Sequence, residues 1–314
     1  MTKTEIAKKL KNINNALIIC HLRPDGDTLS SAFSLKYALE KMGKSAKVYC
    51  SDKIPEKHIF LGILGELTEN LTGYEAMIAV DIASEERMGD ALPYFRKCKE
   101  TFNIDHHVSN GRFAKYNYVS DQTANAMNIY DIIVELGVEI DEKLANLLYL
   151  GICTDSGNFS QSNTTARAFT VASDLVTRGA KSAKIYNAMF KNQSVERAKL
   201  YAHVMNGIKF YHDGKLAIIT TMQKDLERFG LDASVNEGFV DFPLSVGSVE
   251  IAISILQKDD KTYKISFRSK NYVNVNELAS TFGGGGHVTA SGAIICGFYE
   301  DVIDKLVFVC GNYL

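Results

Sequence analysis

The fold is decided by the segment ALIICHLRPDGDTLSS, residues 16–31. Its first five residues, Ala16–Cys20, are apolar and predict a buried strand. A polar loop follows, and a helix is then expected from Asp27 or Thr28 to Met42. A strand, a loop and a helix in this order predict the first unit of an α/β fold.

The loop of this segment carries one imidazole and two carboxylates, those of His21, Asp25 and Asp27. Pro24 and Gly26 oppose helix within the loop and predict a tight turn. Two carboxylates in such a turn can point at neighbouring metal ions. A lone Asp-Gly-Asp is nevertheless more often a turn whose side chains bond to their own backbone. The motif gains weight only if other polar groups lie beside it.

Further apolar runs predict more strands, and the stretches between them predict helices, as in a mostly parallel sheet flanked by helices. The strands are expected at 46–50, 77–80 and 101–104, and the helices at 123–136, 142–150, 164–178 and 181–190. His21, Asp81 and Asp105 each follow an apolar run directly. Ligands of open parallel sheets bind at the carboxyl ends of the strands, so we expect a site there.

Three further motifs supply candidate site residues. Asp81 ends one strand, a position that otherwise often caps a helix. Asp105, His106 and His107 end another, and adjacent residues of extended chain face opposite ways. One imidazole can therefore bind a metal while the other faces the substrate, and Asp105 can orient a histidine. Asp155 closes a helical stretch, where its charge opposes the helix dipole unless a cation lies nearby.

Together these motifs predict a centre for divalent metal ions. Carboxylates mixed with imidazole favour Mn²⁺ or a related ion over Ca²⁺, and the lack of thiolates excludes a structural zinc site. Two ions about 4 Å apart can clamp both oxygens of a phosphoryl displacement. We therefore expect phosphate ester hydrolysis, with six metal ligands: His21, Asp25, Asp27, Asp81, His106 and Asp155.

The pattern changes after about residue 207, which predicts a second, smaller α/β domain. We expect a catalytic domain at 1–190, a helical connector at 191–207 and a substrate domain at 208–314, with the active site in the cleft between the domains. Strands of the second domain are expected at 216–221, 249–256 and 262–267, and a helix at 275–282.

Four consecutive glycines, Gly283–Gly286, precede His287 in the second domain. Their unshielded amides, followed by the start of a helix, are expected to bind phosphate. The alternative is a flexible loop. Arg268 and Ser269, at the end of a predicted strand, are expected to bind the same substrate, although a lone arginine is more often a solvated surface cation.

Composition restricts the class of protein and of substrate. The net charge of -2 argues against a grip on long nucleic acid and leaves a small anionic substrate. Six cysteines without a C-x-x-C pair are expected to be reduced core residues. Neither a signal peptide nor a span of transmembrane length is recognisable, so we expect a cytoplasmic protein without membrane partners, which could form a homodimer.

The motifs, in this order, resemble motifs one to four of the DHH phosphoesterase superfamily, and the glycine run with Arg268 and Ser269 resembles the associated DHHA1 domain. The size is similar to the nanoRNase and pAp phosphatase branch. That resemblance implies hydrolysis of oligoribonucleotides, from dinucleotides to about five-mers, and of pAp to AMP. The sequence departs from the family pattern at 28–31 and 121–124, and neither departure removes a ligand.

The resemblance also implies roles for individual residues. His21, Asp25 and Asp81 would hold a first Mn²⁺, and Asp27, Asp81, His106 and Asp155 a second, with Co²⁺ or Mg²⁺ as substitutes. His107 would contact the scissile phosphate. Three alternatives remain open: a cyclic-di-AMP or linear pApA phosphodiesterase, a pyrophosphatase or exopolyphosphatase, and an inactive nucleotide-binding module.

Overall fold

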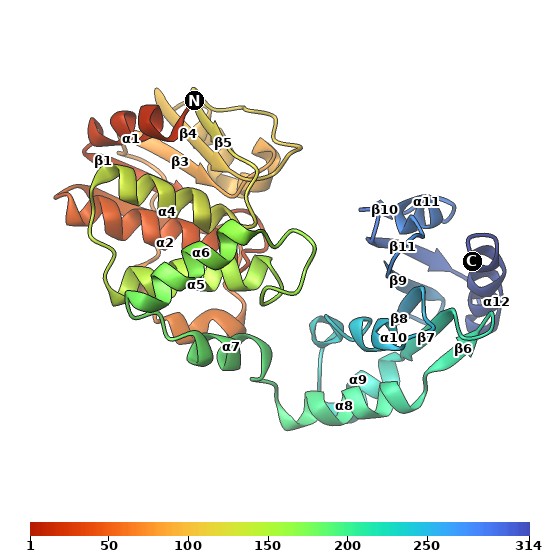
Figure 1. Cartoon of the computed structure of the whole chain (residues 1–314). Helices are drawn as coiled ribbons and strands as arrows, with labels where there is room; N and C mark the ends of the chain where they lie inside the picture. Colours follow the sequence, from red (N-terminus) through yellow and green to blue (C-terminus); the bar gives the residue numbers. More distant parts are fainter. The chain divides into compact units, whose positions relative to one another are not determined.

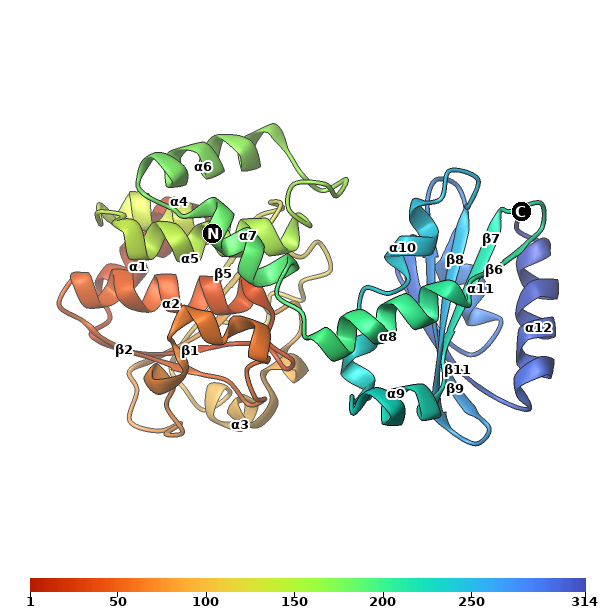
Figure 2. The same ribbon diagram turned by 90° about the horizontal axis from the view of Figure 1, so that it is seen from below.

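A computed structural model describes the backbone of residues 1–314 and the side chains of all residues except 59, 61 and 64. The chain divides into two compact units, Met1–Asn192 and Gln193–Leu314 (Figure 1, Figure 2). Among the described residues, no helix has both the length and the apolar character needed to cross a membrane.

The first unit is built on a sheet of five parallel strands in the order β2-β1-β3-β4-β5. The strands are β1 Asn15–Ile19, β2 Ser45–Tyr49, β3 Ala76–Val80, β4 Glu100–Asp105 and β5 Tyr116–Val119. Every residue of β3 is buried. Because both faces of the sheet are covered, its central strands are continuous apolar runs.

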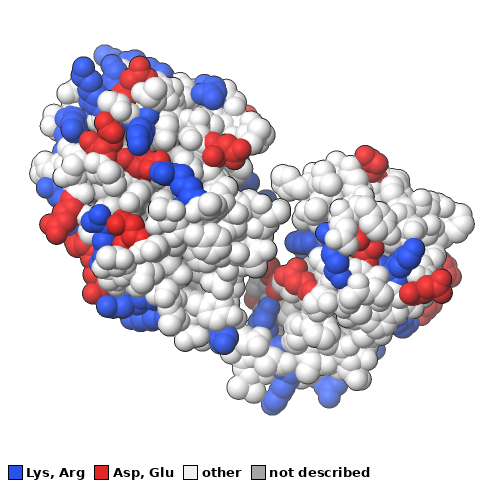
Figure 3. All heavy atoms as spheres, in the orientation of Figure 1, with Lys and Arg blue, Asp and Glu red and all other residues white. Residues whose placement is uncertain are grey.

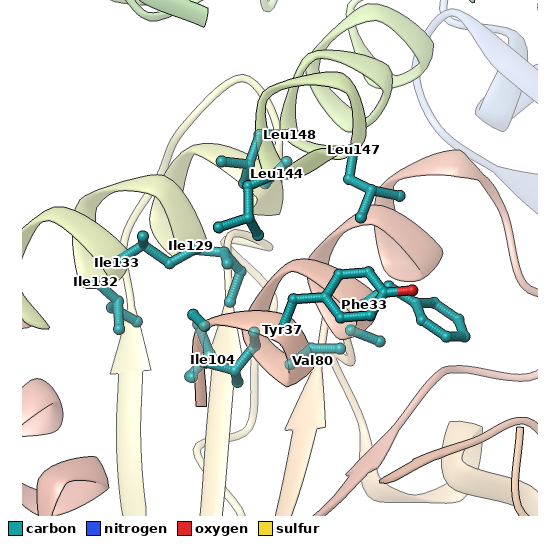
Figure 4. Packing of buried hydrophobic residues seen from close by; sticks show 14 of the residues in the cluster. Phe33, Tyr37, Val80, Ile104, Ile129, Ile132, Ile133, Leu144, Leu147 and Leu148 are labelled. Atoms are coloured by element: carbon teal, nitrogen blue, oxygen red, sulfur yellow. The ribbon is translucent and has the colours of Figure 1, made fainter. Parts of the chain in front are cut away.

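Helices surround this sheet. They are α1 Lys3–Lys11, α2 Gly26–Lys41, α3 Leu92–Phe95, α4 Asn125–Leu136, α5 Glu142–Asp155, α6 Ala166–Thr177 and α7 Ser182–Phe190. The 3-10 helices η1 Glu56–Leu61, η2 Leu64–Glu66 and η3 Glu85–Ala91 lie between them in sequence. The larger core joins α2, α4 and α5 to one face of the sheet, and Figure 4 shows Phe33, Ile129 and Leu144 converging above Val80 and Ile104.

The start of α2 differs from the expectation. The helix begins at Gly26 rather than at Asp27 or Thr28, and Asp25 is its N-cap. The Oδ1 atom of Asp25 accepts hydrogen bonds of 3.0 Å from the amides of Asp27 and Thr28. Pro24 lies before the helix, where its ring does not clash with helical backbone. The turn is therefore shorter than expected, and Asp27 lies in the first helical turn.

The other expected elements of the first unit are present, with two kinds of error. Helix α5 continues beyond 150 because its last turn remains apolar up to Cys153, and it ends at Asp155, which was expected to close a helical stretch. Helix α1 and strand β5 were not predicted. Strand β5 is short and mostly half-buried, so it lacks the apolar run that marks the other strands.

The second unit contains a six-stranded sheet in the order β10-β11-β9-β8-β7-β6. Its strands are β6 Lys209–Tyr211, β7 Leu216–Thr221, β8 Ile251–Asp259, β9 Thr262–Ser269, β10 Gly285–Gly286 and β11 Ala290–Cys296. Only the β7–β8 pair is parallel among these described strands. This unit is therefore a mixed sheet, unlike that of the first unit.

Helices cover both faces of the second sheet. They are α8 Val195–Asn206, α9 Gln223–Phe229, α10 Asp241–Ser245, α11 Val275–Ser280 and α12 Tyr299–Gly311, with the 3-10 helix η4 Ala233–Asn236. One core contains residues of α11 and α12, and a smaller one contains residues of α8 and α9. Helix α8 falls within the second unit. Helix α12 was not predicted.

Candidate metal centre

The carboxyl edge of the first sheet gathers the candidate metal ligands. The loops after β1, β3 and β4 bring His21, Asp81 and His106, the start of α2 brings Asp25 and Asp27, and the end of α5 brings Asp155. Ligand atoms lie within 4.8 Å of one another in each of three groups: His21, Asp25 and Asp81; Asp27, His106 and Asp155; and Asp81, His106 and His107. The structure thus brings all six predicted metal ligands together.

Asp81 lies at the middle of this cluster and is only 3% exposed. Its Oδ2 atom is 3.5 Å from Nε2 of His21, and its Oδ1 atom is 3.4 Å from Nε2 of His106. The backbone of Asp81 has φ of 59°, a left-handed conformation that aspartate adopts more readily than most residues. Each carboxylate oxygen therefore faces a different imidazole.

Hydrogen bonds orient both imidazoles. Nδ1 of His21 is 2.8 Å from the carbonyl of Leu22, and Nδ1 of His106 is 3.0 Å from that of Gln122. A carbonyl can only accept, so each Nδ1 carries a hydrogen and each ring turns its Nε2 toward carboxylates, where the lone pair of a neutral ring could bind a cation. Nη2 of Arg87, 3.1 Å from Nδ1 of His21, is then free to donate to the Leu22 carbonyl at 3.5 Å.

The gaps between these atoms suit a metal ion. Nε2 of His21 is 3.4 Å from Oδ2 of Asp25, and Nε2 of His106 is 3.6 Å from Oδ2 of Asp155. Such separations exceed an ordinary hydrogen bond of about 3 Å. The buried Oδ1 of Asp81 has no hydrogen-bond partner among the described residues. Buried polar atoms normally have partners, so imidazole nitrogens and carboxylate oxygens arranged in this way fit cations between them.

The pKa values of the cluster reflect its surplus of negative charge. Burial opposes the charged form of His21, but Asp25 and Asp81 raise its pKa to about 10. Burial likewise opposes the charged form of His106, whose pKa Asp81 and Asp27 raise to about 11. Burial, with the charge of Asp81, raises the pKa of Asp155 to about 7. Divalent cations bound here would take the place of these protons.

Asp27 has a second task that the sequence did not reveal. It accepts hydrogen bonds from the amides of Asn125 at 2.5 Å and Ala126 at 2.8 Å. These amides begin α4, whose own N-cap, Ala124, provides no side-chain hydrogen bond. A carboxylate at a helix N-terminus is favoured by the helix dipole and by the free amides. Asp27 thus links the cluster to α4.

Two glycines let α2 and α5 approach closely enough to form the centre. A Cβ atom added at Gly26 would lie 2.5 Å from Oγ1 of Thr154, next to Asp155. One added at Gly151, within α5, would lie 2.7 Å from Oδ1 of Asp27. The importance of Gly151 was not predicted. Its signal was a glycine inside an otherwise helical run, which often marks close packing.

His107 is held differently from the two histidines inside the cluster. Its Nδ1 atom is 2.8 Å from Oδ1 of Asp105 and 3.8 Å from Oδ1 of Asp81. Asp105 raises the pKa of His107, although burial opposes this. Asn110, another residue that the sequence analysis missed, donates to Oδ2 of Asp105 at 2.5 Å. Since Nδ1 is engaged by Asp105, only Nε2 of His107 remains for another partner.

The two candidate residues at the end of β9 lie on opposite faces of the second sheet. Ser269 is buried, and its Oγ atom is 3.5 Å from the carbonyl of Val288. Arg268 is half-buried and lies between Ala252 of β8 and Ala290 of β11. Successive side chains of a strand alternate between faces. The structure therefore does not place Ser269 beside Arg268.

The glycine run has a different local structure from the expected one. No helix follows it, because Gly285 and Gly286 form β10 and pair with β11. Four of the amides donate within the unit: Gly283 to Ser280, Gly284 to Ala279, Gly286 to the side chain of Asn276, and His287 to Ala290. The expectation of unshielded amides before a helix start was therefore wrong for these four groups.

Close backbone packing explains the glycines. A Cβ atom at Gly284 would lie 2.1 Å from the carbonyl oxygen of Gly292, whereas one at Gly285 would meet only Asn276, at 3.6 Å. The side chain of His287 is exposed. Binding of substrate by Gly283–Gly286 and His287 remains a prediction, and it would use the open side of Gly285 and the imidazole of His287.

Comparison with protein families adds to this geometry. Residues 15–152 match the model of the DHH family, N-terminal domain, and residues 215–310 match the DHHA1 domain. The chain is 32% identical to a bifunctional oligoribonuclease and PAP phosphatase NrnA of Thermus thermophilus, over 96% of this chain and 92% of the relative. It is 26% identical to the Bacillus subtilis protein of the same name, over 95% of each chain.

A solved structure shares the fold. An exopolyphosphatase-related protein from Bacteroides fragilis superposes with a TM-score of 0.91 at 22% identity, covering 99% of this chain and 96% of that one. At this identity the likeness concerns the fold alone.

Proposed function

This chain belongs to the DHH family of phosphoesterases, and from that premise we propose that it hydrolyses short oligoribonucleotides, from dinucleotides to about five-mers, to mononucleotides. We propose conversion of pAp to AMP as a companion activity. The observation that carries the proposal is the convergence of all six candidate ligands around Asp81. The printed names of the Thermus thermophilus and Bacillus subtilis relatives support this choice of substrates.

Two Mn²⁺ ions are the proposed cofactors, with Co²⁺ or Mg²⁺ as substitutes. The first would be held by His21, Asp25 and Asp81, and the second by Asp27, Asp81, His106 and Asp155. Mixed imidazole and carboxylate ligands favour Mn²⁺ over Ca²⁺. Such ions, when bound, polarise the phosphate and lower the pKa of a water molecule. Asp81 would serve both ions, since its oxygens face different imidazoles at 3.4 and 3.5 Å.

The chain's own contribution to phosphate chemistry centres on His107. Asp105 accepts from its Nδ1, holds the ring in one orientation and raises its pKa. When this ring is protonated, its Nε2 carries a hydrogen that can be donated. We propose that this Nε2 donates to the scissile phosphate. Asp105, which acts through His107, is a positioning residue.

The second unit is proposed to bind the part of the nucleotide that does not react. Arg268 supplies a guanidinium on a face of the sheet where its strand neighbours, Ala252 and Ala290, are small. Arginine forms charge-assisted hydrogen bonds and stacks on aromatic rings, and small neighbours leave room for a nucleotide. His287, exposed after the glycine run, is proposed to assist. Ser269 faces the other way and is not expected to touch the substrate directly.

The charge of the molecule suits a small substrate. On the face drawn in Figure 3, acidic and basic side chains are interspersed over both units without a continuous basic area. The net charge is -2. Proteins that bind long nucleic acid release many counterions through a basic face. A short oligonucleotide held by metal ions and a few arginines needs no such face.

The proposal is tested with purified protein and a panel of substrates. The protein, with Mn²⁺, is incubated with pAp, pApA, cyclic-di-AMP, a five-mer RNA and pyrophosphate, and products are separated by chromatography. We expect mononucleotides from pApA and the five-mer, AMP from pAp, and no turnover in excess chelator. Hydrolysis of cyclic-di-AMP or pyrophosphate in preference to the oligoribonucleotides would contradict the proposed substrate, and turnover in chelator would contradict the metal centre.

A further inference from the structure

The arginines of the first unit fall into two groups. Three have a carboxylate partner: Arg96 with Glu85, Arg167 with Asp131 and Arg178 with Asp174. Arg23, Arg87 and Arg112 have no carboxylate partner for their guanidinium groups among the residues whose side chains are described. All three of these are exposed. The difference calls for a reason, because exposed arginines elsewhere in this unit are paired.

The unpaired arginines share one location. Arg23 follows β1, Arg87 lies beyond the end of β3, and Arg112 lies beyond the end of β4. These strands are neighbours in the sheet and are parallel, so the three loops leave from the same edge. That edge carries the metal centre. Nη2 of Arg87 is 3.1 Å from Nδ1 of His21, which places this guanidinium directly beside the centre.

Hydrogen bonds join the three loops into a continuous rim. The amide of Leu22 donates to the carbonyl of Arg87 at 2.7 Å, which joins the first loop to the second. The amide of Gly111 donates to the carbonyl of Ala83 at 3.1 Å, and Nδ2 of Asn110 to that of Ile82 at 3.0 Å. These two bonds join the second loop to the third.

Two of the arginines are held in left-handed backbone conformations. Arg23 has φ of 55° and Arg112 has φ of 51°, which is unfavourable for a residue with a long side chain. The amide of Arg23 donates to Oδ2 of Asp52 at 2.7 Å, and that of Arg112 to Oδ1 of Asn110 at 2.7 Å. The loops therefore fix both residues at this edge.

We propose that Arg23, Arg87 and Arg112 form a cationic rim that binds a second phosphate group of the substrate, one that is not hydrolysed. The inference rests on the proposed function and assigns to it a substrate class: nucleotides with a terminal phosphate besides the scissile one, such as pApA or pAp. Guanidinium groups bind phosphate oxygens in pairs of charge-assisted hydrogen bonds. The rim also offsets the repulsion between such a phosphate and the carboxylates of the centre.

The test compares two dinucleotides that differ only in the terminal phosphate. We measure kcat/KM for pApA and ApA with wild type, with the double variant Arg23→Gln/Arg112→Gln, and with Arg178→Gln as a control whose arginine is paired on α6. Arg87 is left unchanged because it touches His21. We expect the pApA to ApA ratio to fall about 10- to 100-fold in the double variant. The ratio should stay constant in the control, and a double Arg→Lys variant should keep part of the preference.

Other outcomes would contradict the proposal that the rim binds phosphate. An unchanged ratio in the double variant would show that the arginines do not recognise the terminal phosphate. Equal losses on both dinucleotides, with fewer bound metal ions by elemental analysis, would mean that they only support the loops. If wild type cleaves neither dinucleotide, the proposed function fails. The binding affinities of pApA and ApA, measured by calorimetry, then test the rim separately. Tighter binding of pApA has to appear in wild type and disappear in the double variant.

Discussion

The two units place their candidate residues by different means. In the first, the strands are parallel, and residues that directly follow them meet at one edge, as His21 and Asp81 do. In the second, the candidates Arg268 and Ser269 are consecutive residues within strand β9, where successive side chains point to opposite faces of the sheet. Sequence position alone is therefore enough to predict convergence in the first unit. In the second, the face of each side chain also has to be known.

The largest expected effect tests whether the first unit forms one centre. We expect Asp81→Ala to lower kcat/KM for pApA more than any other single ligand change, because it removes a carboxylate that faces both imidazoles. Retention of more than about a tenth of the activity, a loss below ~1.4 kcal/mol, would contradict the bridging role. The control is Asp90→Ala, an exposed carboxylate in the same strand-end connection. It should leave activity and metal content unchanged.

The next effect separates residues that hold metal from those that face the substrate. His107→Ala should lower kcat roughly 10²- to 10⁴-fold, the usual range for a positioned acid or electrostatic group. Its metal content should stay near that of wild type, because Nδ1 of His107 already donates to Asp105. Elemental analysis and steady-state kinetics on the same preparations decide this. Loss of one ion per chain would place His107 among the ligands.

Prediction from sequence was successful where a local pattern determines the structure. The central strands were found because apolar runs such as Ala76–Val80 end in polar residues, whereas β5, mostly half-buried, gave no such run. The convergence of His21, Asp81 and His106 was predicted because these residues follow the ends of parallel strands. Gly151 was not singled out, because its importance depends on the distance between α5 and Asp27. Contacts between residues far apart in the sequence, unlike periodicity, cannot be recognised in any short segment.

The same limit explains part of the error at the glycine run. Four glycines in sequence suggested exposed amides, but most of those amides donate to Ser280, Ala279 and Asn276. These partners lie in the preceding helix α11. The bonds of Gly283 and Gly284 reach only three and five residues back and close the end of that helix, where glycine with positive φ is favoured. Only the bond from Gly286 to Asn276 depends on how β10 returns along β11.

A smaller effect on activity is expected in the second unit. Arg268→Ala should lower kcat/KM for pApA about 10- to 150-fold, as expected for a charge-assisted contact worth roughly 1.5 to 3 kcal/mol. Turnover of a small activated aryl phosphodiester should change much less, because it needs only the metal centre. Ser269→Ala is the matched control and should affect both substrates little. Equal losses on both substrates in Arg268→Ala would mean that Arg268 supports the fold.

The glycine run offers a paired test of packing against substrate binding. Gly284→Ala should destabilise the second unit by roughly 1 to 3 kcal/mol, because its Cβ would lie 2.1 Å from the Gly292 carbonyl oxygen. Gly285→Ala should keep the stability within about 1 kcal/mol of wild type, since its Cβ has room. If the glycine run binds nucleotide, Gly285→Ala should lower kcat/KM for pApA several-fold. Wild-type kinetics in Gly285→Ala would show that the glycines serve packing and do not bind the substrate.

The last effect is on stability alone and concerns Glu250, which fixes the loop before α11. This buried carboxylate accepts from the amides of Tyr272 at 2.7 Å and Val273 at 3.0 Å, and from the backbone and side chain of Asn271. Burial disfavours its charge, but the amides more than compensate and hold the pKa of Glu250 below its usual 4.5. A depressed pKa stabilises the fold above the unfolded value, and the contribution is lost as pH falls through the folded pKa.

Glu250→Gln should therefore lower the free energy of unfolding by roughly 1 to 3 kcal/mol at pH 7, because its NH₂ group faces amide donors. The difference from wild type should stay constant down to about pH 5 and shrink below the unfolded pKa of 4.5. Urea unfolding between pH 3 and pH 7 measures this, with chelator present so that metal binding in the first unit does not contribute. Glu227→Gln, exposed on α9, is the control. A difference that persists unchanged at pH 3 would show that the glutamine acts through packing and not through lost charge.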